Sequence, residues 1–189
     1  MISLGLDVST SCTGWAIFDE SGKFSDMGTI VLSKIPDLYE KAQKVRDSLQ
    51  DILSKNKVDS IYIEENLQSF RAGFSSARTL STLSRFNGMV SLISYEVFSV
   101  KPEHINVNAA RKSLGIKLVR KKDGGAPTKE QVLNWVDNDL RFIKSSYLWP
   151  LKVLRGGPRK GQEILDPVAY DMADAYVICK SGIVLNRSC

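Results

Sequence analysis

The strongest constraint on the fold lies at the very start of the chain. Apolar side chains occupy every second position from Ile2 to Val8, and Ser3, Gly5 and Asp7 stand between them. A period of two is typical of a strand whose two faces differ. One of those faces ends in the carboxylate of Asp7, although burying an unpaired carboxylate is costly. The charge at the end of this strand therefore needs an explanation.

The first third of the chain predicts a small sheet and one helix. Short turns join the first three strands, which favours an antiparallel meander. The helix, opened by Pro36 and Asp37, would carry the chain back so that the fourth strand lies beside the first. The expected elements are strands at 2–8, 14–18, 24–32 and 58–64, and a helix at 36–54.

The rest of the chain predicts mainly helices. Thr128 and Gln131 have the spacing of a capping box, and the apolar stripe of the first of these helices, which includes Leu92, is expected in the core. We therefore expect an α/β fold in a single domain over residues 1–189, with a mixed five-stranded sheet flanked by helices. The expected elements are a helix at 77–97, a strand at 105–107, a short helix capped by Asn108 and ending near Gly115, a basic loop at 117–127, a helix from Thr128, an irregular stretch at 145–164, and a final helix from Asp166 and Pro167 to about Ser181.

Composition excludes several classes of protein. The chain is 43% hydrophobic and 25% charged, as ordinary globular proteins are. No apolar run approaches the roughly 18 residues that span a bilayer, and the N-terminus lacks the features of a signal peptide. The cysteines Cys12, Cys179 and Cys189 form no C-x-x-C pair, which argues against a disulfide framework or a zinc site. We expect no membrane attachment and an intracellular location, in a bacterial or phage-infected cytoplasm or in an organelle.

The positive charge is concentrated in one segment. The chain carries a net charge of +5, but residues 101–160 hold 14 Lys and Arg against 5 Asp and Glu, whereas the flanking segments are slightly acidic. Basic clusters attract polyanions. A solvated surface is an equally good explanation of the cluster by itself.

Four carboxylates are expected to meet at one end of the sheet. Asp7 and Glu64 end the first and fourth strands, and Asp171 and Asp174 share one face of the final helix. Any one of them alone would more often be a solvated strand end or helix face. Together they repel one another unless cations neutralise them, and oxygen-only ligands suit Mg²⁺ or Mn²⁺. Two such ions about 3.5–4 Å apart can hold the attacking and leaving oxygens of a phosphoryl transfer.

Three stretches, "LGLDVSTSCTGWAIFD", "IYIEENLQSF" and "DMADAYVIC", together resemble the RuvC-type Holliday junction resolvases of the RNase H-like nuclease superfamily. The long basic segment at 145–164 is more like the phage and organellar members. The resemblance implies an RNase H-like fold, a homodimer and Mg²⁺-dependent cleavage of four-way DNA junctions, with Asp7, Glu64, Asp171 and Asp174 as catalytic metal ligands. Glu65 is set aside because strand alternation would point it away from Glu64.

Two further groups of residues are candidates for binding DNA. In the loop after the fourth strand, Phe70 or Phe74, with Arg71 between them, would stack on bases as a wedge does in some family members. Lys117, Lys121 or Lys122 would lie near the scissile phosphate. The full set expected on phosphates is Arg111, Lys112, Lys117, Arg120, Lys121, Lys122, Arg155, Arg159 and Lys160.

Several alternatives remain beside this hypothesis. The same metal site would serve an RNase H-like nuclease acting on other branched DNA or on RNA–DNA hybrids, and a non-catalytic junction-binding protein could share the fold. The first motif also resembles the phosphate loop of sugar kinases and actin-like ATPases, but no second phosphate loop is visible. The glycines of 156–161 do not form a P-loop, because the G-x-x-x-x-G-K-[ST] pattern is absent. Cys12 and His104 are expected to be structural.

Overall fold

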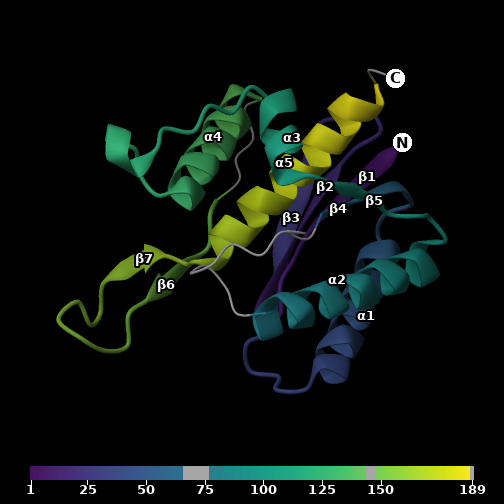
Figure 1. The fold of residues 1–189 in the computed structure, drawn as a ribbon, viewed down its shortest axis with the longest axis horizontal. Coiled ribbons are helices and arrows are strands. Elements are labelled where there is room, and N and C mark those ends of the chain that lie inside the picture. The colour runs from purple at the N-terminus through teal and green to yellow at the C-terminus, as the bar shows by residue number, and fades with distance from the viewer. Residues whose placement is uncertain (66–76, 144–147, 188–189) are drawn as a thin grey trace.

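The computed structural model describes residues 1–65, 77–143 and 148–187, and its centre is a mixed five-stranded sheet (Figure 1). The strand order is β3-β2-β1-β4-β5. The first three strands form the predicted antiparallel meander, and β4 and β5 run parallel to β1. The predicted α/β class is confirmed. The strands are β1 (Ile2–Val8), β2 (Cys12–Phe18), β3 (Phe24–Val31), β4 (Val58–Glu64) and β5 (Glu103–Ile105).

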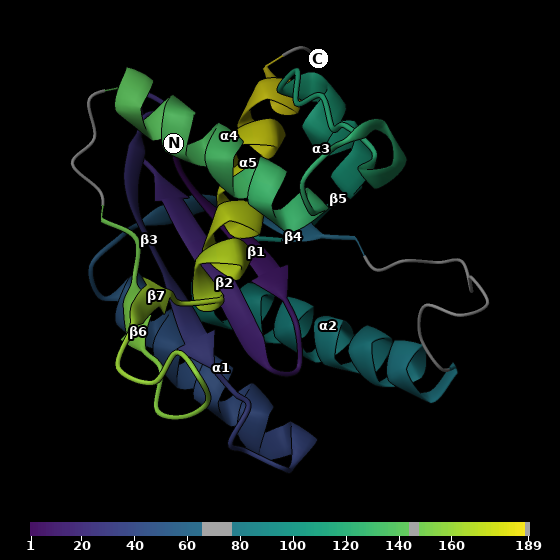
Figure 2. The ribbon, with the colours of Figure 1, turned by 90° about the vertical axis from the view of Figure 1, so that its left-hand side faces the viewer.

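Helices cover both faces of this sheet, so the molecule has three layers (Figure 2). Leu4 and Leu6 of β1 lie in the core under α1 and α2, whereas the intervening Gly5 faces α5. The period of two predicted for the first strand therefore separates two cores. The helices are α1 (Leu38–Leu53) and α2 (Ala77–Phe98) on one face, and α3 (Val107–Ser113), α4 (Thr128–Phe142) and α5 (Val168–Asn186) on the other. No helix in the described ranges is long and apolar enough to cross a membrane.

Helix α5 lies directly on the sheet because glycines remove the side chains between them. A Cβ atom on Gly14 of β2 would stand 2.0 Å from the carbonyl oxygen of Asp171, and one on Gly5 would stand 2.5 Å from Cβ of Cys179. Further along the helix, Gly182 packs in the same way on the ring of Tyr62. These contacts fix the position of the helix relative to β1, β2 and β4.

Helix α4 is held against α5 by a buried polar contact. The carboxylate of Asp139 accepts hydrogen bonds from the hydroxyl of Tyr176 and the ammonium of Lys180. The same ammonium lies 5.7 Å from the ring centre of Trp135. Because buried polar groups are costly when unpaired, this network favours one arrangement of the two helices.

Helix caps were predicted correctly at some ends and wrongly at others. Asp37 caps α1, as predicted. The short helix α3 begins two residues earlier than predicted, because Asn106 rather than Asn108 accepts from the first backbone N–H groups. The capping box at Thr128 is absent, and the Gln131 side chain instead binds the backbone of Val119 across the basic loop.

Three other expectations need correction. The stretch at 145–164 is not irregular, because it contains an antiparallel hairpin of β6 (Leu151–Val153) and β7 (Glu163–Leu165). The final helix continues to Asn186, more than one turn beyond the predicted end. Leu92 is 57% exposed on α2 and lies outside the core.

The close packing at Gly14 predicts opposite outcomes for two glycine substitutions. Gly14→Ala should destabilise the protein by about 1–3 kcal/mol or more, because the new methyl group would overlap the backbone of α5. Gly156→Ala, at a position with no atom within 4 Å of the new Cβ, should change the free energy of unfolding by less than about 0.5 kcal/mol. Urea unfolding followed by circular dichroism measures both. Equal stability of the two variants would show that α5 does not rest on β2.

Candidate active site

Strands β1 and β4 place two carboxylates side by side. They run parallel with Leu6 opposite Ile63, so Asp7 and Glu64 stand at the same end of the sheet. Asp7 falls two residues after Gly5, and so it shares the face that α5 covers. The two carboxylates are hydrogen-bonded to one another, and this contact raises the pKa of Asp7 and lowers that of Glu64.

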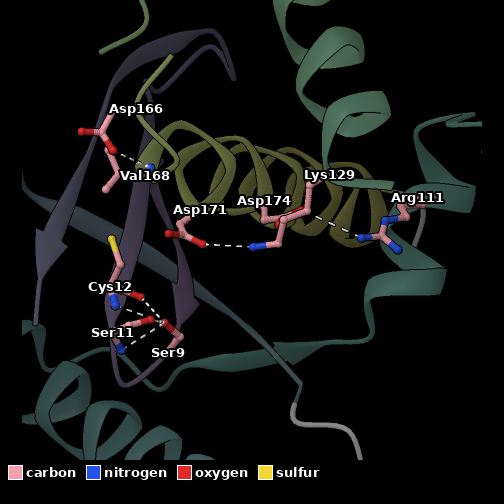
Figure 3. A network of polar contacts seen from close by, with 9 residues as sticks. All are labelled: Ser9, Ser11, Cys12, Arg111, Lys129, Asp166, Val168, Asp171 and Asp174. Carbon is pink, nitrogen blue, oxygen red and sulfur yellow. Dashed lines mark hydrogen bonds and ion pairs between the residues drawn. The ribbon is translucent and has the colours of Figure 1, made fainter. Parts of the chain in front are cut away.

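Helix α5 brings the other two carboxylates to this end of the sheet. Asp171 and Asp174 lie one turn apart near the start of the helix (Figure 3), with side chains only 18% and 14% exposed. The backbone of Asp171 is the part of the helix that rests on Gly14. Since Gly14 pairs with Asp7 across β1 and β2, the contact that seats the helix also sets the distance between these charges. The structure thus brings the four predicted carboxylates together.

Mutual repulsion and burial raise the proton affinity of this cluster. Burial raises the pKa of Asp7 well above its ordinary value, and the charges of Glu64, Asp174 and Asp171 raise it further. Burial also raises the pKa of Glu64. Burial and the neighbouring Glu64 raise the pKa of Asp174 to about 6. The site therefore holds more negative charge than its surroundings neutralise.

Two cations approach the cluster from the side opposite the sheet (Figure 3). Nζ of Lys129, in the first turn of α4, lies 3.4 Å from Oδ1 of Asp171. A guanidinium nitrogen of Arg111 lies 3.9 Å from Oδ1 of Asp174, and its buried Nε has no hydrogen-bond partner within the described residues. Partial burial works against the charge on Lys129, but Asp171 and Asp174 outweigh it and raise its pKa.

Lys129 was missed in the sequence, where nothing distinguished it from the other lysines of the basic segment. Among the residues that the structure describes, Lys117, Lys121 and Lys122 make no ion pair with the four carboxylates. The cations at the acidic site are instead Lys129 and Arg111. That one of those three lysines lies near the scissile phosphate stays a prediction.

A hollow of about 170 Å³ opens beside the carboxylates, between the ends of β1 and β4 and the start of α2. Asp7, Ser9 and Glu64 line it, and the amide of Asn87 fixes its wall by donating to the carbonyl oxygen of Glu64 at 3.1 Å. Glu65, the residue after the end of β4, also borders this hollow, and its carboxylate accepts from the side-chain amide of Asn106 at 3.4 Å.

The donor set fits a hard divalent cation in kind and in charge. Every donor is a carboxylate oxygen, which is the ligand type that Mg²⁺ prefers, and the raised pKa values report a deficit of positive charge. In the described ranges, no three His, Cys, Asp or Glu side chains are already close enough to form a ready metal site. In their ion pairs with Asp171 and Asp174, Lys129 and Arg111 supply part of the positive charge that a metal ion would supply.

The other described candidates for binding DNA make no ion pair with the four carboxylates. Phe70, Arg71 and Phe74 fall outside the described residues. Around α3 and the loop before α4, exposed basic side chains are Lys112, Lys117, Arg120, Lys121 and Lys122, of which Arg120 pairs with Asp123. The hairpin carries the exposed Arg155, Arg159 and Lys160.

Two residues near the site are unsuited to nucleophilic chemistry. Cys12 is buried, and burial with the charge of Asp171 raises the pKa of its thiol to about 12. His104 shares a hydrogen bond of 3.1 Å with Ser91, between β5 and α2. Both therefore have the structural roles expected of them.

The raised pKa values predict that the acidic cluster destabilises the metal-free protein at neutral pH. Since the pKa of Asp174 is about 6, the folded state binds more protons than the unfolded state between about pH 4 and pH 6, and stability falls as pH rises through that window. In the absence of divalent ions, Asp7→Asn should therefore stabilise the protein at pH 7.5 by about 1–3 kcal/mol. The gain should shrink toward zero near about pH 4.

Urea unfolding with a chelator at both pH values measures this effect. Asp47→Asn, at an exposed position on α1, removes the same charge away from the cluster and should change little. A gain for Asp7→Asn that does not depend on pH would show that the four carboxylates titrate independently.

Comparison with known proteins gives a partial relative and solved structures of the same fold. No protein-family model matches the chain. A curated crossover junction endodeoxyribonuclease RuvC from Ehrlichia chaffeensis is 38% identical over 64 residues, which are 33% of this chain and 41% of that protein. The match therefore spans less than half of the relative.

The structural likeness extends over the whole chain. The RuvC of T. thermophilus, solved in complex with a Holliday junction substrate, superposes with a TM-score of 0.65 and 15% identity, covering 100% of this chain and 96% of that one. The yeast mitochondrial Holliday junction resolvase Ydc2 gives a TM-score of 0.51 and 8% identity, covering 98% of this chain and 80% of that one. At such identities the likeness concerns the fold. The predicted resemblance is confirmed, and the chain has the RNase H-like α/β fold of the RuvC-type Holliday junction resolvases.

Proposed function

We propose that this protein is a metal-dependent endonuclease that resolves four-way DNA junctions, with residues 1–189 as one nuclease domain. The observation that carries the proposal is the meeting of Asp7, Glu64, Asp171 and Asp174, from two strands and one helix, at one end of the sheet. The partial relative is a crossover junction endodeoxyribonuclease, and the T. thermophilus RuvC of the same fold is bound to a Holliday junction. This activity would belong to DNA recombination and repair inside the cell.

The four carboxylates would hold Mg²⁺, for which Mn²⁺ would substitute. When bound, the ions supply an activated water and stabilise the charge on the leaving 3′-oxygen. The chain itself positions the carboxylate ligands. Asp7 stands at the centre of the cluster, because the charges of all three other carboxylates act on it. Glu64 is fixed through its backbone by Asn87.

Lys129 would act on the scissile phosphate. Lys129 is 59% exposed while its ammonium lies beside Asp171, so it is within reach of both the cluster and an incoming phosphodiester. A fixed cation at this place stabilises negative charge that develops during the reaction. Arg111 is more buried and would mainly hold Asp174 in position.

A homodimer would suit a substrate with two equivalent strands to cut. Helix α2 offers a surface for it. Leu92 and Tyr95, one turn apart on this helix, are 57% and 52% exposed. Exposed apolar side chains in one patch are typical of protein interfaces.

Substitution of the central carboxylate should separate cutting from binding. Asp7→Asn should lower the rate of junction cleavage by at least about a thousandfold, because a loss of several kcal/mol in the transition state costs about tenfold per 1.36 kcal/mol. Junction affinity should survive, because basic side chains supply it. Cleavage in Mg²⁺ and gel shifts in Ca²⁺ on the same preparation measure both, and Asp47→Asn is the matched control.

The same assay should compare a four-way junction with a flap and an RNA–DNA hybrid. Preferred cleavage of the junction supports the proposal, whereas preferred cleavage of the hybrid or the flap would make the protein an RNase H-like nuclease of another substrate class. Binding of the junction without cleavage by the wild type in Mg²⁺ or Mn²⁺ would make it a junction-binding protein. Near-normal cleavage by Asp7→Asn would refute the metal site.

The dimer has its own test. In sedimentation velocity at micromolar concentration, the wild type should be a dimer, and Leu92→Glu with Tyr95→Glu should be a monomer, because the charges cannot be buried in an apolar interface. Tyr39→Glu, at a 76% exposed aromatic on α1, should leave the dimer intact. A wild type that is monomeric and still cleaves junctions would contradict the dimer.

A further inference from the structure

The hairpin of β6 and β7 carries positive charge that the protein itself does not neutralise. Residues 152–162 contain four basic side chains and no acidic one. Within the described part of the chain, none of the four makes an ion pair, in contrast to Arg111, Arg120 and Lys129. The four basic residues are Lys152, Arg155, Arg159 and Lys160.

The backbone of this hairpin is open to a close partner. It projects from the body of the molecule beside the start of α5 (Figure 1). A Cβ atom added to Gly156, Gly157 or Gly161 would meet nothing within 4 Å. Leu151 and Val153, on one face of β6, are each 56% exposed. Exposed apolar side chains beside unpaired cations indicate a surface that another molecule covers.

The hairpin begins at the edge of the acidic cluster. The backbone N–H of Asp166, just after β7, donates to the carbonyl of Pro150 at 2.8 Å, which closes the base of the hairpin. The carboxylate of the same Asp166 accepts from the N–H of Val168 at the start of α5 (Figure 3). Asp171 follows in the first turn of that helix. The base of the hairpin and the carboxylates are therefore parts of one rigid connection.

The length of the hairpin sets how far it reaches. Backbone pairing runs from Pro150 and Asp166 at the base to Leu154 and Gln162, four residues before Asp166. At about 3.3 Å per residue in a strand, the turn at 155–161 therefore begins roughly 13 Å from the base. Duplex DNA rises about 3.4 Å per base pair, so this reach corresponds to about four base pairs.

We propose that the β6–β7 hairpin is a second DNA-binding element, which binds the phosphate backbone of one duplex arm about four base pairs from the cleavage point. This inference rests on the proposed function, because it places the cleavage point at the four carboxylates. Arg155, Arg159 and Lys160 bind phosphates, and the glycines between them let the backbone approach. The hairpin contributes affinity for a duplex arm of sufficient length and takes no part in the chemical step.

DNA fits this surface better than a protein partner does. The charge on the connecting residues is of one sign, and a polyanion neutralises it along its whole length. A second copy of this chain would bring the same positive charge to the interface. Two-stranded ribbons are also a known shape for lying in or along a groove of duplex DNA.

The test uses junctions with two arm lengths. Arg155→Gln, Arg159→Gln and Lys160→Gln are combined in one variant. Affinity is measured in Ca²⁺ for junctions with arms of about twenty and about three base pairs, the shorter closed by loops, because only the longer arm extends past the roughly 13 Å reach. On long arms the variant should bind about tenfold to a hundredfold more weakly, and the slope of log K against log salt should be less steep by about two to three. On short arms it should match the wild type.

A matched control removes the same charge elsewhere. Lys44→Gln, Lys55→Gln and Lys57→Gln, all exposed on or just after α1, should change affinity for neither junction. In Mg²⁺, the hairpin variant at saturating protein should cut long-armed junctions at the wild-type rate.

The outcomes distinguish this inference from the proposed function. A wild type that neither binds nor cuts junctions refutes the proposed function. A wild type that cuts junctions while the hairpin variant binds long arms equally well, or loses affinity equally on both arm lengths, refutes the hairpin inference alone. A change of oligomeric state in Leu151→Ser with Val153→Ser, together with unchanged long-arm binding of the charge variant, would assign the hairpin to a protein interface and also overturn the inference.

Discussion

The contact of helix α5 with Gly5 of β1 and Gly14 of β2 sets the position of Asp171 and Asp174 relative to Asp7. Because Gly14 has no side chain, the backbone of Asp171 packs directly on it. Cys179, two turns further along the helix, packs on Gly5 in the same way. With the helix seated at this distance, its first turns stand over the end of β1. Any larger residue at these two positions would lift the helix and separate Asp171 and Asp174 from Asp7.

The arrangement of charge at this contact works against stability. Three carboxylates with raised pKa values are held where water is scarce, and among the described residues the cations that pair with this cluster are Lys129 and Arg111. The rest of α5 compensates through packing, because most of its residues are buried in the core with α3 and α4. Electrostatic repulsion that is concentrated at one site and offset by packing of the surrounding core is typical of active sites.

The basic side chains fall into two groups with different surroundings. Lys129 and Arg111 are paired with the acidic cluster and are partly withdrawn from solvent. Those of the β6–β7 hairpin make no ion pair within the described residues, and the turn that carries most of them begins roughly 13 Å from the base of the hairpin. The first group is placed to act on one phosphate, and the second to hold a duplex arm, as the proposals above require.

The sequence by itself determined the sheet, the four carboxylates and most element positions, because these follow from local patterns. Alternation along β1 predicted its two faces, and the i, i+3 spacing predicted that Asp171 and Asp174 share a side of α5. The segment 148–166 could not be predicted as a hairpin, since its strands of three residues carry too short a pattern. Asn106 and Gln131 were misjudged because several polar residues compete for each cap, and backbone geometry selects among them.

Only the tertiary structure decided which cation joins the acidic site. Lys129 and Lys121 belong to the same basic segment and look alike in the sequence. Lys129 reaches Asp171 because α4 is fixed on α5 by Asp139, Tyr176 and Lys180. Electrostatic pairing depends on distance between atoms, and that distance comes from contacts between helices that lie more than thirty residues apart in the chain.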